Sequence, residues 1–246
     1  KLLIFSDNRQ EAAHQAGYMK DRQRIFVIRH IIESLVRGAG TDGLSFDEVP
    51  HKILNKLQDH GLARKRLTDK ERDLWIHALL FEAAGEFCRS THQRVSLENL
   101  ALVEVRYEFL EELREDPEFQ EVCRSSAIDV QRGLVLVRGI LDRMRRARAV
   151  DFPFFQEYID PAQDKWAMLQ VEPYSLSIPE HERRPIFFML DRNEAARAGI
   201  SGYKFQAVTR DTTQGGAAVI PRLLAREGLA ESAQDAWIRS VVRLLL

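Results

Sequence analysis

The sequence predicts a mainly α-helical protein with one strand–helix unit at its start and a two-helix unit at its end. Three observations support this fold class. A short apolar run opens the chain, apolar residues recur at intervals of three and four through residues 44–150, and the same spacing returns in residues 219–246. Together they divide the chain into three predicted parts, residues 1–37, 38–150 and 151–246.

The first part begins with a short apolar segment, residues 2–5, which predicts a buried strand. Ser6-Asp7-Asn8-Arg9-Gln10 then forms a predicted tight turn into a helix, and Glu11 in the first turn suits the helix dipole. The expected apolar face of this helix has helical spacing and consists of Ala12, Ala16, Met19, Ile25, Ile28, Ile32 and Leu35. Glycines at 38, 40 and 43 are expected to end it.

The middle part is predicted to be a series of amphipathic helices. One apolar stripe consists of Phe46, Val49, Ile53, Leu54 and Leu57 and is closed by Gly61, and a second consists of Leu74, Ile76, Leu79, Leu80, Ala83 and Phe87. Residues 110–123 and 126–148 predict two further helices. The pattern of residues 100–107 fits either a strand or a helix end.

The third part differs in composition, since six of the eight prolines lie there. Residues 186–190 and 203–208 predict strands. Two helices, over residues 219–226 and 233–246, are expected to flank a turn at Gly228, as in a helix-turn-helix or winged-helix core. Their apolar faces should meet and bury Trp237. The first face consists of Ile220, Leu223, Leu224 and Leu229, and the second of Ala236, Trp237, Val241, Leu244 and Leu245.

Composition limits the partners of the chain. A net charge of −1 excludes capture of DNA by the overall field, so any nucleic-acid contact needs a local basic patch. Cys88 and Cys123 are too few for a disulfide framework or a four-cysteine zinc site, which favours a reducing, cytoplasmic location. No apolar run approaches the ~20 residues that span a bilayer, so no membrane partner is expected.

Motifs for nucleotide and metal chemistry are missing from the sequence. No Gly-x-x-x-x-Gly-Lys-(Ser/Thr) loop is present, and Gly215-Gly216 is not followed by lysine. None of the seven histidines is part of a metal-binding His-Glu-x-x-His motif. We therefore expect no catalytic residue, no metal site and no bound cofactor in this chain, and no hydrolysis of ATP by it alone.

The segment Leu3-Ile-Phe-Ser-Asp-Asn-Arg-Gln-Glu-Ala-Ala-His-Gln-Ala-Gly17 resembles motif IV of one group of large superfamily 2 (DEAD/DEAH-box) DNA helicases. That group includes the DISARM anti-phage helicase and related DNA-repair helicases. Weaker similarity lies in Ser96-Leu-Glu-x-Leu-x-Leu-Val-x-Val-x-Tyr107 and in Arg-x-Arg148 before Asp151-Phe-Pro. The resemblance implies that residues 1–37 begin a second RecA-like domain and that the rest is an accessory insertion. It also implies that ATP and Mg²⁺ are bound elsewhere in the parent protein.

The motif IV turn supplies the first candidate nucleic-acid contacts. Free backbone N–H groups at a helix start attract phosphate, and Ser6, Asn8, Arg9 and Gln10 add donors there. In such helicases this turn touches the backbone of the tracking strand, which implies that role for these residues. The alternative from the residues alone is that Ser6 or Asp7 caps the helix and Arg9 pairs with an acid.

Two further basic groups are candidate phosphate contacts. Arg145 and Arg146 belong to a dense run of arginines, which also suits the C-terminal end of a helix dipole. Lys204 and Arg210 flank aromatic residues, a combination that suits a single strand, and a core role for the aromatics is the alternative.

Together these observations predict a piece of an ATP-dependent DNA helicase or translocase that contributes backbone contacts and a strand-guiding insertion. The expected partners are DNA and a subunit of a defence or repair complex. The alternatives are a non-catalytic DNA- or partner-binding helical module and a helical spacer. Residue 1 is not methionine and residues 244–246 end inside a helical pattern, so we expect the chain to be cut from a longer protein.

Overall fold

A computed structural model describes most of the two helical regions of the chain. Within the described backbone, side chains are described from residue 23 onward, except in the two strands and at 219, 221, 223 and 245. The described backbone covers residues 9–88, 96–147, 149, 157–158, 165–176, 178, 187–189, 205–207, 219–226 and 228–245.

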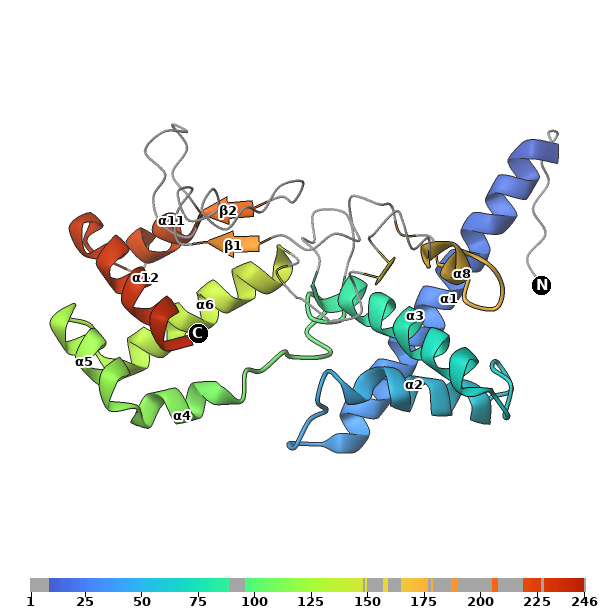
Figure 1. Ribbon diagram of the computed structural model, residues 1–246, viewed down its shortest axis with the longest axis horizontal. Helices are drawn as coiled ribbons and strands as arrows, with labels where there is room; N and C mark the ends of the chain where they lie inside the picture. The colour runs from blue at the N-terminus through green and yellow to red at the C-terminus, as the bar shows by residue number, and fades with distance from the viewer. Residues whose placement is uncertain are drawn as a thin grey trace. The chain divides into compact units, whose positions relative to one another are not determined.

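The described residues are mainly helical, which confirms the predicted fold class at that level. The chain divides into two compact units that combine segments distant in sequence (Figure 1). Unit 1 comprises Lys1–Phe87, Val95–Glu104 and Phe154–Pro179, and unit 2 comprises Cys88–Arg94, Val105–Pro153 and Glu180–Leu246. These units do not follow the predicted three-part division, because both the middle and the last part contribute to each of them.

Unit 1 is built from α1 (Arg9–Ala39), α2 (Glu48–Asp59), α3 (Asp69–Phe87) and the short α8 (Trp166–Gln170). Helix α2 packs against both α1 and α3, and α8 packs against α3. The core lies where their apolar faces meet, with Ile32, Ile53, Leu79 and Leu169 almost fully buried. Burying each such side chain stabilises the fold by about 1.5–3 kcal/mol.

The predicted apolar stripes of unit 1 are largely confirmed. Helix α2 buries four of the five residues of its stripe, and its C-terminus is closed where Gly61 takes a φ of 69°. The Leu62 N–H bonds to the Leu57 carbonyl at 2.8 Å, which satisfies an otherwise free helix end. In α3 the prediction was wrong in detail. The predicted residues Leu74 and Ile76 are only half-buried, and three residues outside the predicted stripe are buried: Trp75, Ala78 and Phe81.

Unit 2 begins with α4 (Phe109–Glu115), α5 (Pro117–Ser125) and α6 (Val130–Arg146). The single helix predicted over residues 110–123 is two helices, because Pro117 holds Asp116 in an extended conformation (φ −71°, ψ 121°). The Asp116 carboxylate then caps α5 by accepting from the Phe119 N–H at 2.8 Å. Residues 103–106, before α4, form neither a strand nor a helix.

The end of unit 2 contains β1 (Phe187–Met189), β2 (Phe205–Ala207), α11 (Val219–Arg226) and α12 (Glu231–Leu245). Both predicted strands are confirmed, at three residues each, and they pair in parallel with Phe188 opposite Gln206. The predicted opening strand at residues 2–5 lies outside the described residues.

Helices α11 and α12 form the predicted two-helix unit. They pack on each other and also on α6 and α5, respectively (Figure 1). Trp237 is 1% exposed and shares one apolar cluster with Leu224 and Leu229, which confirms its predicted burial. Ala236 is exposed and Ile238 is buried instead, so the predicted face of α12 was wrong at that position. The winged-helix assignment stays a prediction.

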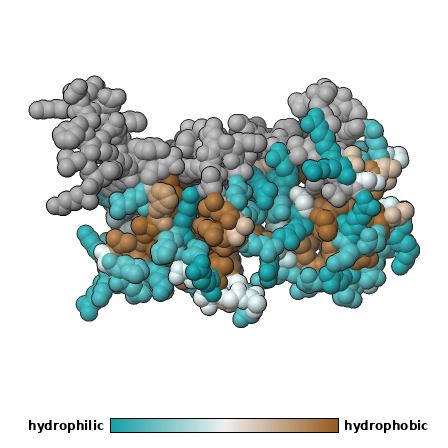
Figure 2. Space-filling model, turned by 180° about the vertical axis from the view of Figure 1, so that it is seen from behind, coloured by the Kyte–Doolittle hydropathy of each residue, from teal (hydrophilic) through white to brown (hydrophobic). Residues whose placement is uncertain are grey.

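Hydrophilic side chains cover much of the described surface, with apolar residues visible between them (Figure 2). Some large apolar side chains remain exposed, among them Phe26 of α1 and Val135 of α6. Among the helices that the structure describes, none combines the length and the apolar character needed to cross a bilayer.

Candidate nucleic-acid interface

The described part of the motif IV segment, from Arg9 to Gly17, belongs to α1. This helix begins at Arg9 and includes Gln10, and the side chains of both are outside the described residues. Ser6 and Asn8 lie wholly outside the described residues, as do Lys204 and Arg210. The turn predicted at residues 6–8 lies outside the described residues, so it stays a prediction, as do the contacts of these side chains.

Arg145 is held inside unit 2 by a network of three side chains. Only 7% of Arg145 is exposed. Its Nε donates to the Tyr107 hydroxyl at 3.1 Å and its Nη2 donates to Asp142 Oδ1 at 2.9 Å. The Tyr107 hydroxyl donates to the same Asp142 oxygen at 3.0 Å, which closes the network. Arg145 therefore joins the last turns of α6 to the segment that leads into α4.

This arrangement favours a structural role for Arg145 over the predicted phosphate contact. A guanidinium bound to a carboxylate and a hydroxyl has fewer donors left for a phosphate. The burial of the Arg145 side chain also limits its access to a nucleic-acid backbone. Burial also raises the pKa of Tyr107 to about 12, with Arg145 acting in the opposite direction, so the hydroxyl keeps its proton near neutral pH. Arg146, the next residue, is half-buried and stays a candidate for a phosphate contact.

A second polar network ties unit 1 together. Glu86 of α3 accepts from Arg29 Nε of α1 at 2.9 Å with one carboxylate oxygen, and from the Leu97 N–H at 2.6 Å with the other. Both side chains are less than a fifth exposed. One carboxylate thus fixes α1, α3 and the start of the 96–102 turn, which is an architectural function.

The half-buried imidazole of His77 contacts a tyrosine in unit 1. His77 Nδ1 lies 2.7 Å from the Tyr158 hydroxyl, and the two rings meet edge to face. Burial raises the pKa of Tyr158 to about 12, so the hydroxyl keeps its proton near neutral pH. Burial lowers the pKa of His77, Asp73 and Glu157 raise it, and Lys165 lowers it.

Unit 1 is therefore expected to lose stability in mild acid through His77. Its folded-state pKa lies below the ordinary value near 6.5, so the unfolded chain takes up the proton first, and the free energy of unfolding falls as pH drops below about 6.5. Urea unfolding between about pH 7.5 and 5 measures this loss. His77→Gln, which keeps an acceptor for Tyr158, should flatten that part of the profile. An unchanged profile in this variant would assign the acid sensitivity to other groups.

Within the described ranges no group of three or more His, Cys, Asp or Glu side chains could hold a metal ion. Comparison with known proteins found no family model, curated protein or solved structure that matches the chain. The residues themselves therefore carry the functional assignment.

The polar networks could be only partly foreseen from the sequence. Asp142 and Arg145 are three residues apart on one helix, a spacing at which opposite charges meet. Tyr107 is 38 residues away from Arg145, and no local pattern indicates that it completes the network. The same holds for Tyr158, which is 81 residues from His77.

Proposed function

We propose that this chain is part of an ATP-dependent DNA helicase or translocase of the kind used in antiviral defence or DNA repair. Its first segment contributes contacts with the nucleic-acid backbone, and its helical part is an accessory insertion that guides a strand. The observation that carries the proposal is the match of residues 5–17 to motif IV. Within that match Ser6, Asn8, Arg9 and Gln10 supply the donors for phosphate.

The start of α1 supports this placement. Helix α1 begins at Arg9, and Ser6, Asp7 and Asn8 come directly before Arg9 in the sequence. Free N–H groups and the positive end of the helix dipole favour an anion at such a position. The helix has 31 residues, so the dipole is fully developed.

ATP and Mg²⁺ belong to the rest of the parent protein in this proposal. The sequence has no Gly-x-x-x-x-Gly-Lys-(Ser/Thr) loop. We therefore assign no step of ATP hydrolysis to this chain.

Arg9→Ala in the full helicase is expected to weaken DNA binding about equally for all sequences, because phosphates carry no sequence information. The loss of one phosphate contact should reduce the magnitude of the salt slope by about one unit. Filter binding at several salt concentrations measures both quantities.

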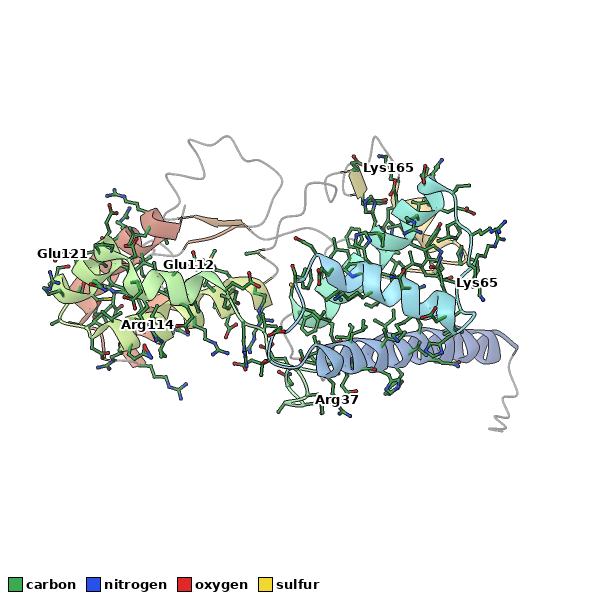
Figure 3. The ribbon with its side chains drawn as sticks, turned by 90° about the horizontal axis from the view of Figure 1, so that it is seen from below. Arg37, Lys65, Glu112, Arg114, Glu121 and Lys165 are labelled. Carbon is green, nitrogen blue, oxygen red and sulfur yellow. The ribbon has the colours of Figure 1, made fainter. Side chains whose placement is uncertain are left out.

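Arg37→Ala is the matched control. Arg37 lies near the other end of α1, is exposed and pairs with Glu33 (Figure 3). Its removal deletes the same charge from the same helix and should leave the slope unchanged. Equal slopes for the Arg9 variant and the unmodified helicase would contradict the proposed contact.

A further inference from the structure

Charge is unevenly distributed among the helices of unit 2. Helix α6 has five arginines and one aspartate, and α11 has two arginines and no acidic residue. Helix α4 has three glutamates and one arginine, and α5 has two glutamates and one arginine. Figure 3 shows Glu112, Arg114 and Glu121 on this acidic pair. A chain with a net charge of −1 therefore contains a basic pair of helices, α6 and α11, that pack on each other.

Three of these arginines belong to α11 or reach the turn that follows it. Arg222 and Arg226 are four residues apart on α11, so they share one face of that helix. Gly228 follows α11 with a φ of 86°. Arg132 of α6 reaches the same turn, since its Nη2 lies 2.8 Å from the point that a Cβ of Gly228 would occupy. We call these three residues the α6–α11 arginine surface.

The side chains of this surface are exposed. Arg132, Arg222 and Arg226 are all exposed, and none of them takes part in an ion pair with another described residue. The carboxylate nearest to Arg132 in sequence, Asp129, accepts from the Arg132 backbone N–H at 3.2 Å as the cap of α6. Glu227, which follows Arg226, lies outside the described residues. The core side of α11 is taken by Ile220 and Leu224, so the arginines lie on its solvent side.

Helix capping accounts for only part of this arrangement. One cation near the last carbonyls of α11 offsets its dipole, and Arg226 in the last turn already does so. The carbonyls of Leu224 and Ala225 are satisfied by the Leu229 and Gly228 N–H groups, at 2.9 and 3.0 Å. Arg132 and Arg222 are therefore not needed to complete this helix end.

We infer that the α6–α11 arginine surface binds the phosphate backbone of nucleic acid without reading its sequence. Guanidinium groups match phosphate oxygens with paired N–H donors, and several of them on one face neutralise successive phosphates. The inference does not rest on motif IV, which lies on unit 1, and it adds a second contact region to the proposed function.

The test is DNA binding by the 246-residue chain, measured by fluorescence anisotropy with a labelled duplex and a labelled single strand at several salt concentrations. R132Q/R222Q/R226Q should weaken binding at least about tenfold near 0.1 M salt and reduce the slope by about two to three units. The matched control K65Q/R66Q/K70Q removes three exposed cations from unit 1 and should change the slope little. Circular dichroism verifies that both variants keep their helices.

The measured slopes distinguish a phosphate-binding surface from a general charge effect and from self-association. Equal losses of DNA affinity in the two triple variants would show a general charge effect and overturn the inference. An unchanged salt slope in R132Q/R222Q/R226Q would also overturn it. Salt-sensitive self-association of the chain, lost only in R132Q/R222Q/R226Q, would instead assign the surface to the acidic α4–α5 pair of a second copy. Binding that survives Arg9→Ala but not the triple change would support this surface and leave motif IV unsupported.

Discussion

Arg145→Ala is expected to lower the free energy of unfolding of unit 2 by about 3 kcal/mol, because it leaves the Asp142 carboxylate without its cationic partner. Arg145 is 7% exposed and Asp142 has a side chain exposed by 24%, so water replaces the lost contact poorly. Tyr107→Phe removes the two hydroxyl contacts and keeps both charges, so it should cost about 1 kcal/mol. Hydrogen exchange on peptides from α6 and α12 reports the opening of this unit separately from unit 1.

Arg124→Ala provides the control for this prediction. Arg124 lies in the same unit, pairs with Glu121 and has a side chain exposed by 73%. Exposed pairs contribute at most about 1 kcal/mol, so this variant should stay close to the unmodified chain. An Arg145 variant as stable as the Arg124 variant would show that the network adds nothing to the fold.

The burial of Arg145 also changes how a DNA-binding experiment on the arginine run should be designed. A double change of Arg145 and Arg146 to alanine would combine a folding defect with any lost contact. Arg146→Gln alone leaves the three residues of the Tyr107–Asp142–Arg145 network in place. If Arg146 contacts phosphate, this single change reduces the salt slope by about one unit, and urea unfolding measures any change in stability beside it.

Apolar spacing predicted most of the described helices, but it missed one break at a proline and one wide buried face. Intervals of three and four found α2 correctly because one face of it meets a continuous core. The same spacing joined residues 110–123 into one helix and overlooked the break that Pro117 imposes on Asp116. In α3 the buried face is wide, so periodicity did not show that Trp75 is inside and Ile76 only partly so.

The candidate interface was less predictable than the fold. The dense run of arginines predicted a phosphate contact at Arg145. The structure shows Arg145 buried against Tyr107, a contact that local spacing in the sequence does not indicate. Arg132, Arg222 and Arg226 are spread over two helices, and the packing of α6 on α11 brings Arg132 to the turn that follows α11. A basic surface of this kind depends on how the helices pack. A run of arginines in the sequence can therefore include a buried residue, and it does not show arginines that come from separate helices.

Gly133→Ala is the second substitution with a large expected effect, because α5 and α6 pack closely at this glycine. A Cβ on Gly133 would lie 2.5 Å from Cys123 Sγ and 3.1 Å from Phe119 Cζ, and both of those side chains are fully buried. Such overpacking costs about 1–3 kcal/mol or more, whereas alanine gains only about 1 kcal/mol in helix propensity. We expect a net loss of about 2 kcal/mol of unfolding free energy, measured by urea denaturation with hydrogen exchange on α5 and α6 peptides.

A double-mutant cycle identifies the clash as the cause. Cys123→Ala removes the sulfur and on its own costs about 1–2 kcal/mol through the cavity it leaves. Combined with Gly133→Ala it should cost less than the two single changes added together, with a coupling of about 1 kcal/mol, because the new methyl group occupies the vacated space. Phe119 stays in place, so the rescue is partial. Gly38→Ala, on α1 with no heavy atom within 4 Å of its would-be Cβ, should be neutral or stabilising. Additive losses in the cycle would mean that Gly133 is needed for a reason other than its contact with Cys123.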